Sequence, residues 1–520
     1  MRRERLFRIL GLLDQELIEE AQGASSPAAV QRPWLRALAA AACVTLLLVG
    51  GAAWLITGGF QGYGSAPPTT PAESGSGYTG HEDAGSGFMS YAGPVFPLTA
   101  LDAADSLSAE RALSLDFSPG TLESGAEEVW GASVRDVYKL TNTTDADVTT
   151  TLLYPFAGSF GDFGSVKASL SIDGVPAAAT LLAGGYAGGF SGILTENGEN
   201  DGTFNLREPG IWEDYRTLLA DGSYLQTALS PEIDLEEPVV VYEFLNSTGN
   251  SEEHPAATQS IQFTADSSKT SILTYGINGR SWDEETGSQR CSYFVPGVQR
   301  DFDRHLLVVR GEDLGSYTLQ GYEDGGCKDG EELDTVSCDV VRTETTLGSV
   351  FRDLVKTHSD WFWDGNVNGT ADGFSLEVYQ QAAALLFLQY GSGSDAPMDR
   401  YADGRLDDIL QEAMYQDRVF YLAVEVTIPA GGAVEAAASF RKAPSFDFEC
   451  ADTARTGIQG YDLVTGLGSD LSFSVQTVSV SHAENIEIVD QNLGLDPESG
   501  VTTVLLDPAQ EHYYLEIREK

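Results

Sequence analysis

The sequence predicts a mainly β protein: antiparallel β-sandwich-like domains with an inserted α-helical segment, preceded by one N-terminal transmembrane helix. Three observations predict this fold class. Much of the chain after residue 93 alternates apolar and polar residues with period two, which is typical of half-buried strands. The period changes to that of a helix over 346–416. One uncharged apolar run, 37–57, is long enough to cross a hydrocarbon core of about 30 Å.

The size and charge of the chain restrict its class. At 520 residues it exceeds what one hydrophobic core usually serves, which predicts about three structural units. Hydrophobic residues make up 42% of the chain, which is enough to build cores and excludes wholesale disorder. The formal net charge is −48, and a surface that acidic repels phosphate backbones. We therefore expect no nucleic acid among the partners.

Residues 1–36 and 37–57 are the predicted cytoplasmic amphipathic tail and the predicted transmembrane helix. Six arginines precede the apolar run, and no Lys or Arg follows it until Arg111. The positive-inside rule then places the N-terminus in the cytoplasm and the remainder outside a bacterial cell membrane, as a single-pass protein. A cleaved signal peptide is the alternative, but the run is too long for a usual signal peptide and starts too far into the chain.

The tail carries an apolar stripe at helical spacing within residues 4–21, formed by Leu6, Leu10, Leu13 and Leu17. A stripe of this kind needs a surface to lie on, either the inner leaflet of the membrane or a helix of a cytoplasmic regulatory partner. A fraying juxtamembrane segment is the alternative, because helices this short are marginal in water.

The string LFRILGLLDQELIEEA, followed by a short spacer with proline and one apolar run, resembles the N-terminal tails of single-pass envelope proteins of clostridial Gram-positive bacteria, including anti-sigma-type regulators. This resemblance covers only the start of the chain and implies a protein of the cell envelope. The segment 138–156 is similar to the opening of β-sandwich modules such as inter-alpha-trypsin-type domains. That second resemblance carries over no ligand site.

The chain beyond the apolar run divides by composition and period. Residues 58–92 are rich in Gly, Ser and Pro, which predicts a stalk. Strand patterns then predict a β-rich exported domain, 93–345, and a C-terminal β-sandwich-like domain, 421–520. Between them, 346–420 is predicted as a helical insertion in which Ser375 begins one helix.

Four cysteines lie in the region predicted to be exported, where disulfide bonds are permitted. These candidates are Cys291, Cys327, Cys338 and Cys450. Cys327 and Cys338 flank a turn-rich loop that one bridge would close, and Cys291 with Cys450 would then join distant strands. Sequence alone leaves the connectivity open.

One cluster of oxygen ligands resembles the first half of the calcium loop of EF-hand and dockerin modules. Asp364, Asn366, Asn368 and Asp372 have the spacing of calcium ligands, and a helix follows. Ser375 stands where that loop needs a bidentate carboxylate. The alternative is an Asn/Gly-rich connection that ends in a serine cap. Calcium is thus a weak candidate, and the sequence predicts no other cofactor.

No catalytic motif indicates an enzyme. The sequence lacks the H-E-x-x-H, G-x-S-x-G and G-x-x-x-x-G-K-[ST] patterns. We therefore expect an acidic β-rich region that binds or senses in the cell envelope, with regulatory coupling through the cytoplasmic tail. The alternatives are an adhesion module that binds an envelope protein or a glycan, and an exported glycan-active enzyme with a pair of carboxylates.

Overall fold

The computed structural model describes residues 90–121, 127–128, 131–163, 168–186, 216, 219–220, 222–283, 286–298, 303–362, 374–395, 397, 401–447 and 456–520. All of them belong to one compact unit, Ser76–Lys520. The predicted tail, 1–36, and the predicted transmembrane helix, 37–57, lie outside the described residues, as does the predicted stalk up to residue 89.

The helices of the described part are short. None of them is both long and apolar enough to cross a membrane. The longest, α7 (Leu347–Phe362), has 16 residues and includes Arg352, Asp353 and Lys356, whereas a crossing takes about 20 mostly apolar residues. On this finding we correct two predictions: the transmembrane helix in the fold class, and the localisation as a single-pass protein of the bacterial membrane. What the structure shows is a mainly β chain with several sheets.

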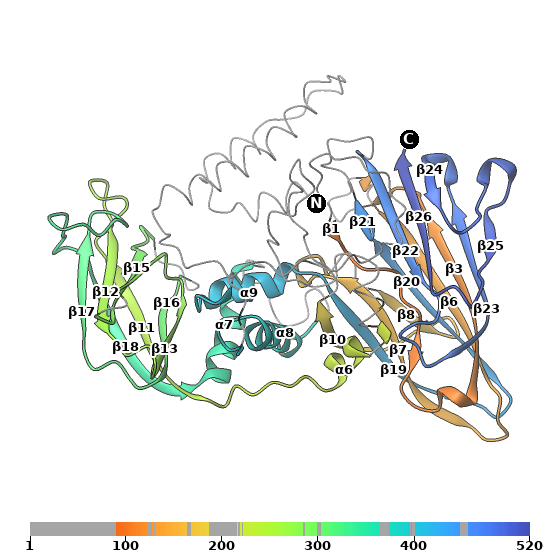
Figure 1. Ribbon diagram of the computed structural model, residues 1–520, viewed down its shortest axis with the longest axis horizontal. Helices are drawn as coiled ribbons and strands as arrows, with labels where there is room; N and C mark the ends of the chain where they lie inside the picture. Colours follow the sequence, from red (N-terminus) through yellow and green to blue (C-terminus); the bar gives the residue numbers. More distant parts are fainter. Residues whose placement is uncertain are drawn as a thin grey trace, which may run out of the picture. The chain divides into compact units, whose positions relative to one another are not determined.

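A seven-stranded sheet forms one side of a large β-sandwich (Figure 1). Its strands β3 and β6 bury every second residue, so that one face packs on the core and the other meets solvent. In spatial order the seven strands are β25 (Thr503–Leu505), β23 (Ser472–Ser481), β3 (Leu107–Asp116), β6 (Ala132–Asn142), β20 (Ala433–Lys442), β8 (Ser169–Ile172) and β9 (Val175–Pro176).

Two smaller sheets share the hydrophobic core of the large sandwich with that sheet. The first is formed by β1 (Ser90–Tyr91), β21 (Phe446–Asp447), β22 (Ile458–Val464), β26 (His512–Glu519) and β24 (Ile486–Gln491). The second is formed by β10 (Thr180–Tyr186), β19 (Arg418–Ile428), β7 (Val148–Gly158) and β2 (Thr99–Ala100).

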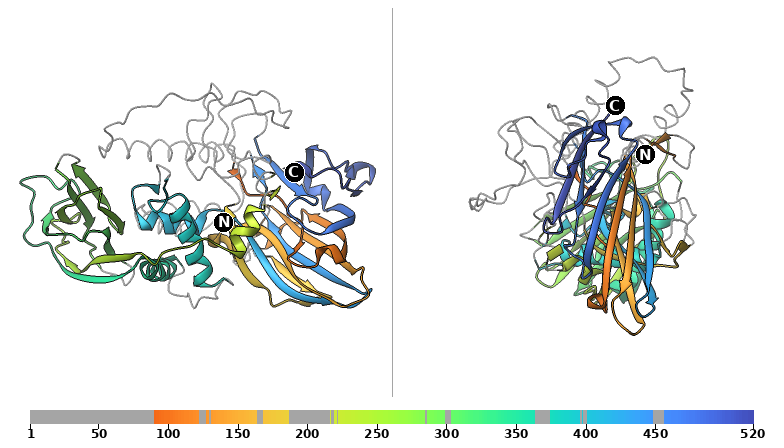
Figure 2. Two further views of the ribbon diagram at one scale, coloured as in Figure 1. Left: turned by 60° about the horizontal axis from the view of Figure 1, so that its bottom comes forward. Right: turned by 90° about the vertical axis from the view of Figure 1, so that its right-hand side faces the viewer.

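Strands from distant parts of the sequence pair in the large sandwich. β19 lies antiparallel to β7 from Val148 opposite Ile428 to Gly158 opposite Arg418, β20 pairs with β6, and β23 runs parallel to β3. In Figure 2 the orange strands near residue 100 and the blue strands beyond residue 420 accordingly lie in the same sheets. The strands of the segment 421–520 therefore do not stand apart but complete a sandwich begun before residue 190.

A small β-sandwich is contiguous in sequence, from Pro238 to Thr346. One of its sheets, the inner sheet, contains β13 (Thr270–Tyr275), β16 (His305–Gly311), β11 (Pro238–Thr248) and β18 (Ser337–Thr346). The other, the outer sheet, contains β14 (Gly279–Asp283), β15 (Ser288–Phe294), β12 (Thr258–Thr264) and β17 (Tyr317–Tyr322). A core of its own lies between the two sheets.

Helices α7, α8 (Leu376–Gln389) and α9 (Leu406–Tyr415) form a helical unit within the segment predicted to be helical. Ser375 caps α8, because its hydroxyl accepts a hydrogen bond from the amide of Val378. The second face of the inner sheet packs on these helices, which explains why β16 is apolar along nearly its whole length. The remaining elements are α6 (Ser223–Leu229), β4 (Gly120–Thr121), β5 (Glu127–Glu128), η1 (Ala104–Ser106), η2 (Phe160–Asp162), η4 (Ala483–Asn485) and η5 (Pro497–Ser499).

A buried ion pair joins the sheets of the large sandwich. Arg111 of β3 donates from Nη2 to Oδ2 of Asp136 on β6 at 2.7 Å, and from Nε to Oδ1 at 2.9 Å. Both side chains are buried. Arg111 also donates to the carbonyls of Val464, at 2.6 Å, and Phe96, at 3.2 Å. The hydroxyl of Tyr138 donates to Asp136 at 2.7 Å.

The ion pair therefore leaves no charge of either residue without a partner. Burial works to lower the pKa of Arg111, but the charge and hydrogen bonds of Asp136, together with Tyr138 and Tyr154, outweigh it and raise that pKa above its ordinary value. Removing one member of such a pair is costly, because the other remains buried and uncompensated.

We expect Asp136→Asn to lower the free energy of unfolding by about 3–5 kcal/mol, because it takes the counter-charge from Arg111. The matched control is Glu110→Gln on the same two strands, where Lys139 Nζ and Glu110 Oε1 form an exposed pair at 2.9 Å. Its expected cost is below about 1 kcal/mol. Urea unfolding of both variants measures the difference, and equal costs would contradict the role of the buried pair.

Candidate functional site

Two arginines and one lysine are buried in the described core, and they differ in their hydrogen-bond partners. Arg111 has an aspartate. Lys442 donates from Nζ to the carbonyls of Ala92, at 3.3 Å, and Ala443, at 3.0 Å. Arg418 is only 1% exposed, yet neither its Nε nor its Nη2 has a hydrogen-bond partner in the described part of the chain. A buried charge is stable only when it is paired and hydrogen-bonded. Of the three buried cations in the described core, Arg418 is the one whose N–H groups lack acceptors.

The pleat of β19 turns Arg418 into the core. Arg418 is the first residue of the strand, and Phe420 and Leu422 follow it at period two as members of the main core. Opposite Arg418 on the neighbouring strand β10 stands Tyr186. The backbone register therefore fixes the guanidinium beside an aromatic ring.

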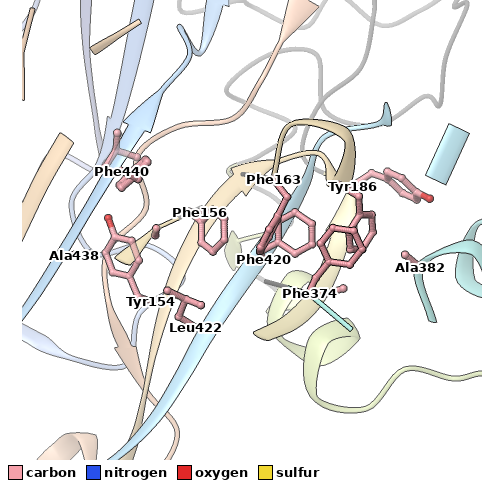
Figure 3. Close-up of a cluster of buried hydrophobic side chains, with 14 of the residues drawn as sticks. Tyr154, Phe156, Phe163, Tyr186, Phe374, Ala382, Phe420, Leu422, Ala438 and Phe440 are labelled. Atoms are coloured by element: carbon pink, nitrogen blue, oxygen red, sulfur yellow. The ribbon is translucent and has the colours of Figure 1, made fainter. Parts of the chain in front are cut away.

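Aromatic rings surround this guanidinium. Its Cζ lies 4.4 Å from the ring centroid of Tyr186 and 5.4 Å from that of Phe160. Figure 3 shows Tyr186, Phe163 and Phe374 in this cluster of buried side chains. The ring centroid of Phe374 lies 4.8 Å from that of Phe160 and 5.3 Å from that of Phe163. The rings attract the positive charge, but Nε and Nη2 have no oxygen acceptor among the described residues.

A tyrosine beside the site links the three helices. The hydroxyl of Tyr379 on α8 donates to the carbonyl of Leu410 on α9 at 2.9 Å, so it accepts from Nδ1 of His358 on α7, also at 2.9 Å. The ring of Tyr379 lies 5.4 Å from that of Phe160. Burial lowers the pKa of His358 to about 4, so this imidazole is neutral near pH 7 and adds no second charge.

The electrostatic surroundings of Arg418 contain no described counter-ion. Burial lowers the pKa of Arg418, and only the hydroxyls of Tyr186 and Tyr379 oppose that effect. A guanidinium stays protonated in proteins even so. Among the described residues, Arg418 forms no ion pair with a carboxylate. The site is therefore a fixed positive charge enclosed by apolar and aromatic groups.

The two free nitrogens of Arg418 suit one kind of ligand. Nε and Nη2 lie on the same edge of the guanidinium, where their N–H groups point in parallel. This fork matches the two oxygens of a carboxylate and forms a bidentate, charge-assisted pair with it. The aromatic surroundings suit an apolar or aromatic body next to that carboxylate.

The predicted calcium ligands Asp364, Asn366, Asn368 and Asp372 all lie outside the described residues. Within the part of the chain that the structure does describe, no group of three or more His, Cys, Asp or Glu side chains could hold a metal ion. The calcium site stays a prediction.

The described cysteines form no disulfide bond. Cys291, Cys327 and Cys338 are free thiols, and Cys450 lies outside the described residues. The predicted bridge from Cys327 to Cys338 is wrong for a structural reason. Cys338 belongs to the core between the two sheets of the small sandwich, whereas the carbonyl of Cys327 accepts from Arg290, on the opposite face of the outer sheet. The outer sheet separates the two thiols.

The sequence contains a signal for Arg418 that belongs to no motif. The predicted C-terminal β domain begins at 421, but period two extends its first strand backwards through Phe420 to Arg418. A basic residue in phase with the apolar face of a strand is unusual, because arginine is seldom fully buried without a partner. That pattern marks a candidate site even where no motif does.

A scan against models of protein families finds no match to this sequence, and a search of curated proteins finds no similar protein. The function therefore has to be inferred from the geometry around Arg418.

Lys442 provides a pH test of the buried charges. Burial lowers its pKa to about 8 from the ordinary 10.5, so the charged form is disfavoured in the folded protein. The penalty is present below about pH 8 and is relieved as the pH rises towards 10.5. Relative to Lys442→Met, we expect the wild type to gain about 2 kcal/mol of unfolding free energy between pH 7 and about pH 9.5. Urea unfolding measures it, and a pH-independent difference would contradict the assignment.

Proposed function

We propose that the chain is a binding protein and that Arg418 takes the carboxylate of a ligand with an apolar or aromatic body. The observation that carries this proposal is the edge of the guanidinium formed by Nε and Nη2, which are buried and have no hydrogen-bond partner among the described residues. A carboxylate would supply both missing acceptors and the missing negative charge at once. Binding would then remove an unfavourable feature of the ligand-free core.

Binding is a better account of this site than catalysis. Tyr379 and His358, two titratable groups beside the site, are hydrogen-bonded to each other, and burial moves both of their pKa values away from neutrality. The pKa of Tyr379 is raised well above its ordinary value, and that of His358 is lowered to about 4. Neither group exchanges a proton readily near pH 7, which general acid–base catalysis would require.

The position of the site supports a sensing role. Arg418 belongs to the large sandwich, while Tyr379, whose hydroxyl contacts α7 and α9, belongs to the helical unit. Phe160 touches both the guanidinium and the ring of Tyr379. A ligand held at Arg418 would thus stabilise the joint between the two parts. The glycan-binding alternatives and the regulatory partner of residues 4–21 stay predictions from the sequence.

We expect phenylacetate to raise the melting temperature of the wild-type protein and the neutral phenylacetamide to leave it unchanged, because only the former supplies a carboxylate to Arg418. Arg418→Met keeps an apolar side chain of similar length without the charge. It should stabilise the ligand-free protein by about 1 kcal/mol or more and abolish the response to phenylacetate. Differential scanning fluorimetry measures each effect.

Arg310→Met is the matched control. Arg310 also lies over an aromatic ring, with its Cζ 5.8 Å from the centroid of Phe387, but its Nη2 is paired with Glu237 at 2.8 Å. This variant should lose stability and keep the response to phenylacetate. If Arg418→Met lost stability as Arg310→Met does, or if phenylacetate had no effect on the wild type, the proposal would be wrong.

A further inference from the structure

The strand β18 leaves one side of its backbone open. It is the last strand of the inner sheet and pairs on one side with β11, from Ser337 opposite Thr248 to Thr346 opposite Pro238. Among the described residues, no backbone group of 338–346 bonds to any segment other than β11. Val341, on this strand, is 45% exposed. An exposed strand edge of this length is a template for another strand.

Two other edges of the small sandwich, at β13 and β17, are bonded at one end by other segments of the chain. At β13 the amide of Thr274 donates to the carbonyl of Gly404 at 2.9 Å. At β17 the connection to β18 folds back, and the amide of Leu333 donates to the carbonyl of Gly321 at 2.9 Å. The edge at β14 is only five residues long. Among the described edge strands of the small sandwich, the ten-residue β18 is therefore the longest whose outer backbone groups have no partner in the chain. We infer that another strand pairs with it.

The charges of β18 select that occupant. Arg342 and Glu344 lie two residues apart, so their side chains point to the same face of the sheet. Charged residues at an edge oppose pairing with an unrelated strand. A second β18 placed antiparallel, with Thr343 opposite its own copy, instead sets each Arg342 opposite the Glu344 of the other chain.

We propose that β18 is the surface through which two copies of this chain associate, as antiparallel neighbours centred on Thr343. Residues 340–346 of each copy pair, which joins the two inner sheets into one of eight strands. Threonine faces threonine at the centre, and Val341 faces Thr345 on the side away from the charges. Both kinds of cross-strand pair stabilise a sheet. Two interchain Arg342–Glu344 pairs then replace the intrachain Arg342–Glu344 contact, in which Nη2 of Arg342 lies 2.9 Å from Oε1 of Glu344. Arg342 keeps its intrachain hydrogen bonds from Nε and Nη2 to Oδ2 of Asp313, at 3.0 and 2.8 Å.

The alternative two-fold registers are rejected by the same charges. Centring the pairing on Arg342 would set two guanidinium groups opposite each other, and centring it on Glu344 would set two carboxylates opposite each other. Like charges directly opposite destabilise a strand pair. Of these three registers, the one at Thr343 combines pairing over 340–346 with charge complementarity, as expected for a self-complementary two-fold interface.

A charge-swap series on the full chain tests this interface. At a chain concentration of about 100 µM the wild type should be dimeric, so that sedimentation equilibrium gives twice the chain mass. Arg342→Glu alone and Glu344→Arg alone each bring like charges together and should raise the dissociation constant about tenfold or more. The double variant Arg342→Glu with Glu344→Arg restores opposite charges and should return the dissociation constant to within about threefold of the wild type.

The swap separates association from folding. Because the double swap also restores the Arg342–Glu344 pair within each chain, urea unfolding of every variant accompanies the mass measurement. Single variants that dissociate while they keep the unfolding free energy of the wild type have lost the interface and not the fold. Lys139→Glu, which alters an exposed ion pair of the large sandwich, is the control and should leave the mass of the wild type unchanged. A monomeric wild type, or a double variant as weakly associated as the single variants, would overturn the proposal. This test does not involve Arg418, so it is independent of the proposed function.

Discussion

The fold depends on the requirement that a buried charge find its counter-charge inside the protein. Arg111 and Asp136 meet this requirement in the large sandwich, where the guanidinium also holds the carbonyls of Val464 and Phe96. These partners come from three separate parts of the chain. The pair therefore fixes how the β-sheets are joined, in addition to any effect on stability, because only one arrangement satisfies every donor and acceptor at once.

The same requirement makes Arg418 a candidate binding site. It is as deeply buried as Arg111 and is held by the same kind of strand pleat, but its neighbours are rings and hydroxyls rather than a carboxylate. A natural core that keeps such a charge does so at a cost in stability, and local departures from good packing are typical of functional sites. The contrast between the two arginines, more than any motif, is what points to binding.

The sequence predicted features that depend on adjacent residues, and it did not predict features that depend on residues far apart in the chain. Alternation over 148–156 predicted the strand β7, and Ser375 marked the beginning of α8, because pleat and capping are decided by adjacent residues. The pairing of β19 with β7 joins segments more than 250 residues apart, and no local pattern encodes it. The cysteines show the same limit: loop spacing suggested a bridge from Cys327 to Cys338, yet a sheet stands between them.

The most direct measurement of the central claim is a crystal structure of the chain grown with phenylacetate. The account predicts a carboxylate beside Arg418, with one oxygen on Nε and the other on Nη2 at about 2.7–2.9 Å. A carboxylate from the chain itself on that edge, or phenylacetate bound elsewhere with the edge still bare, would contradict it.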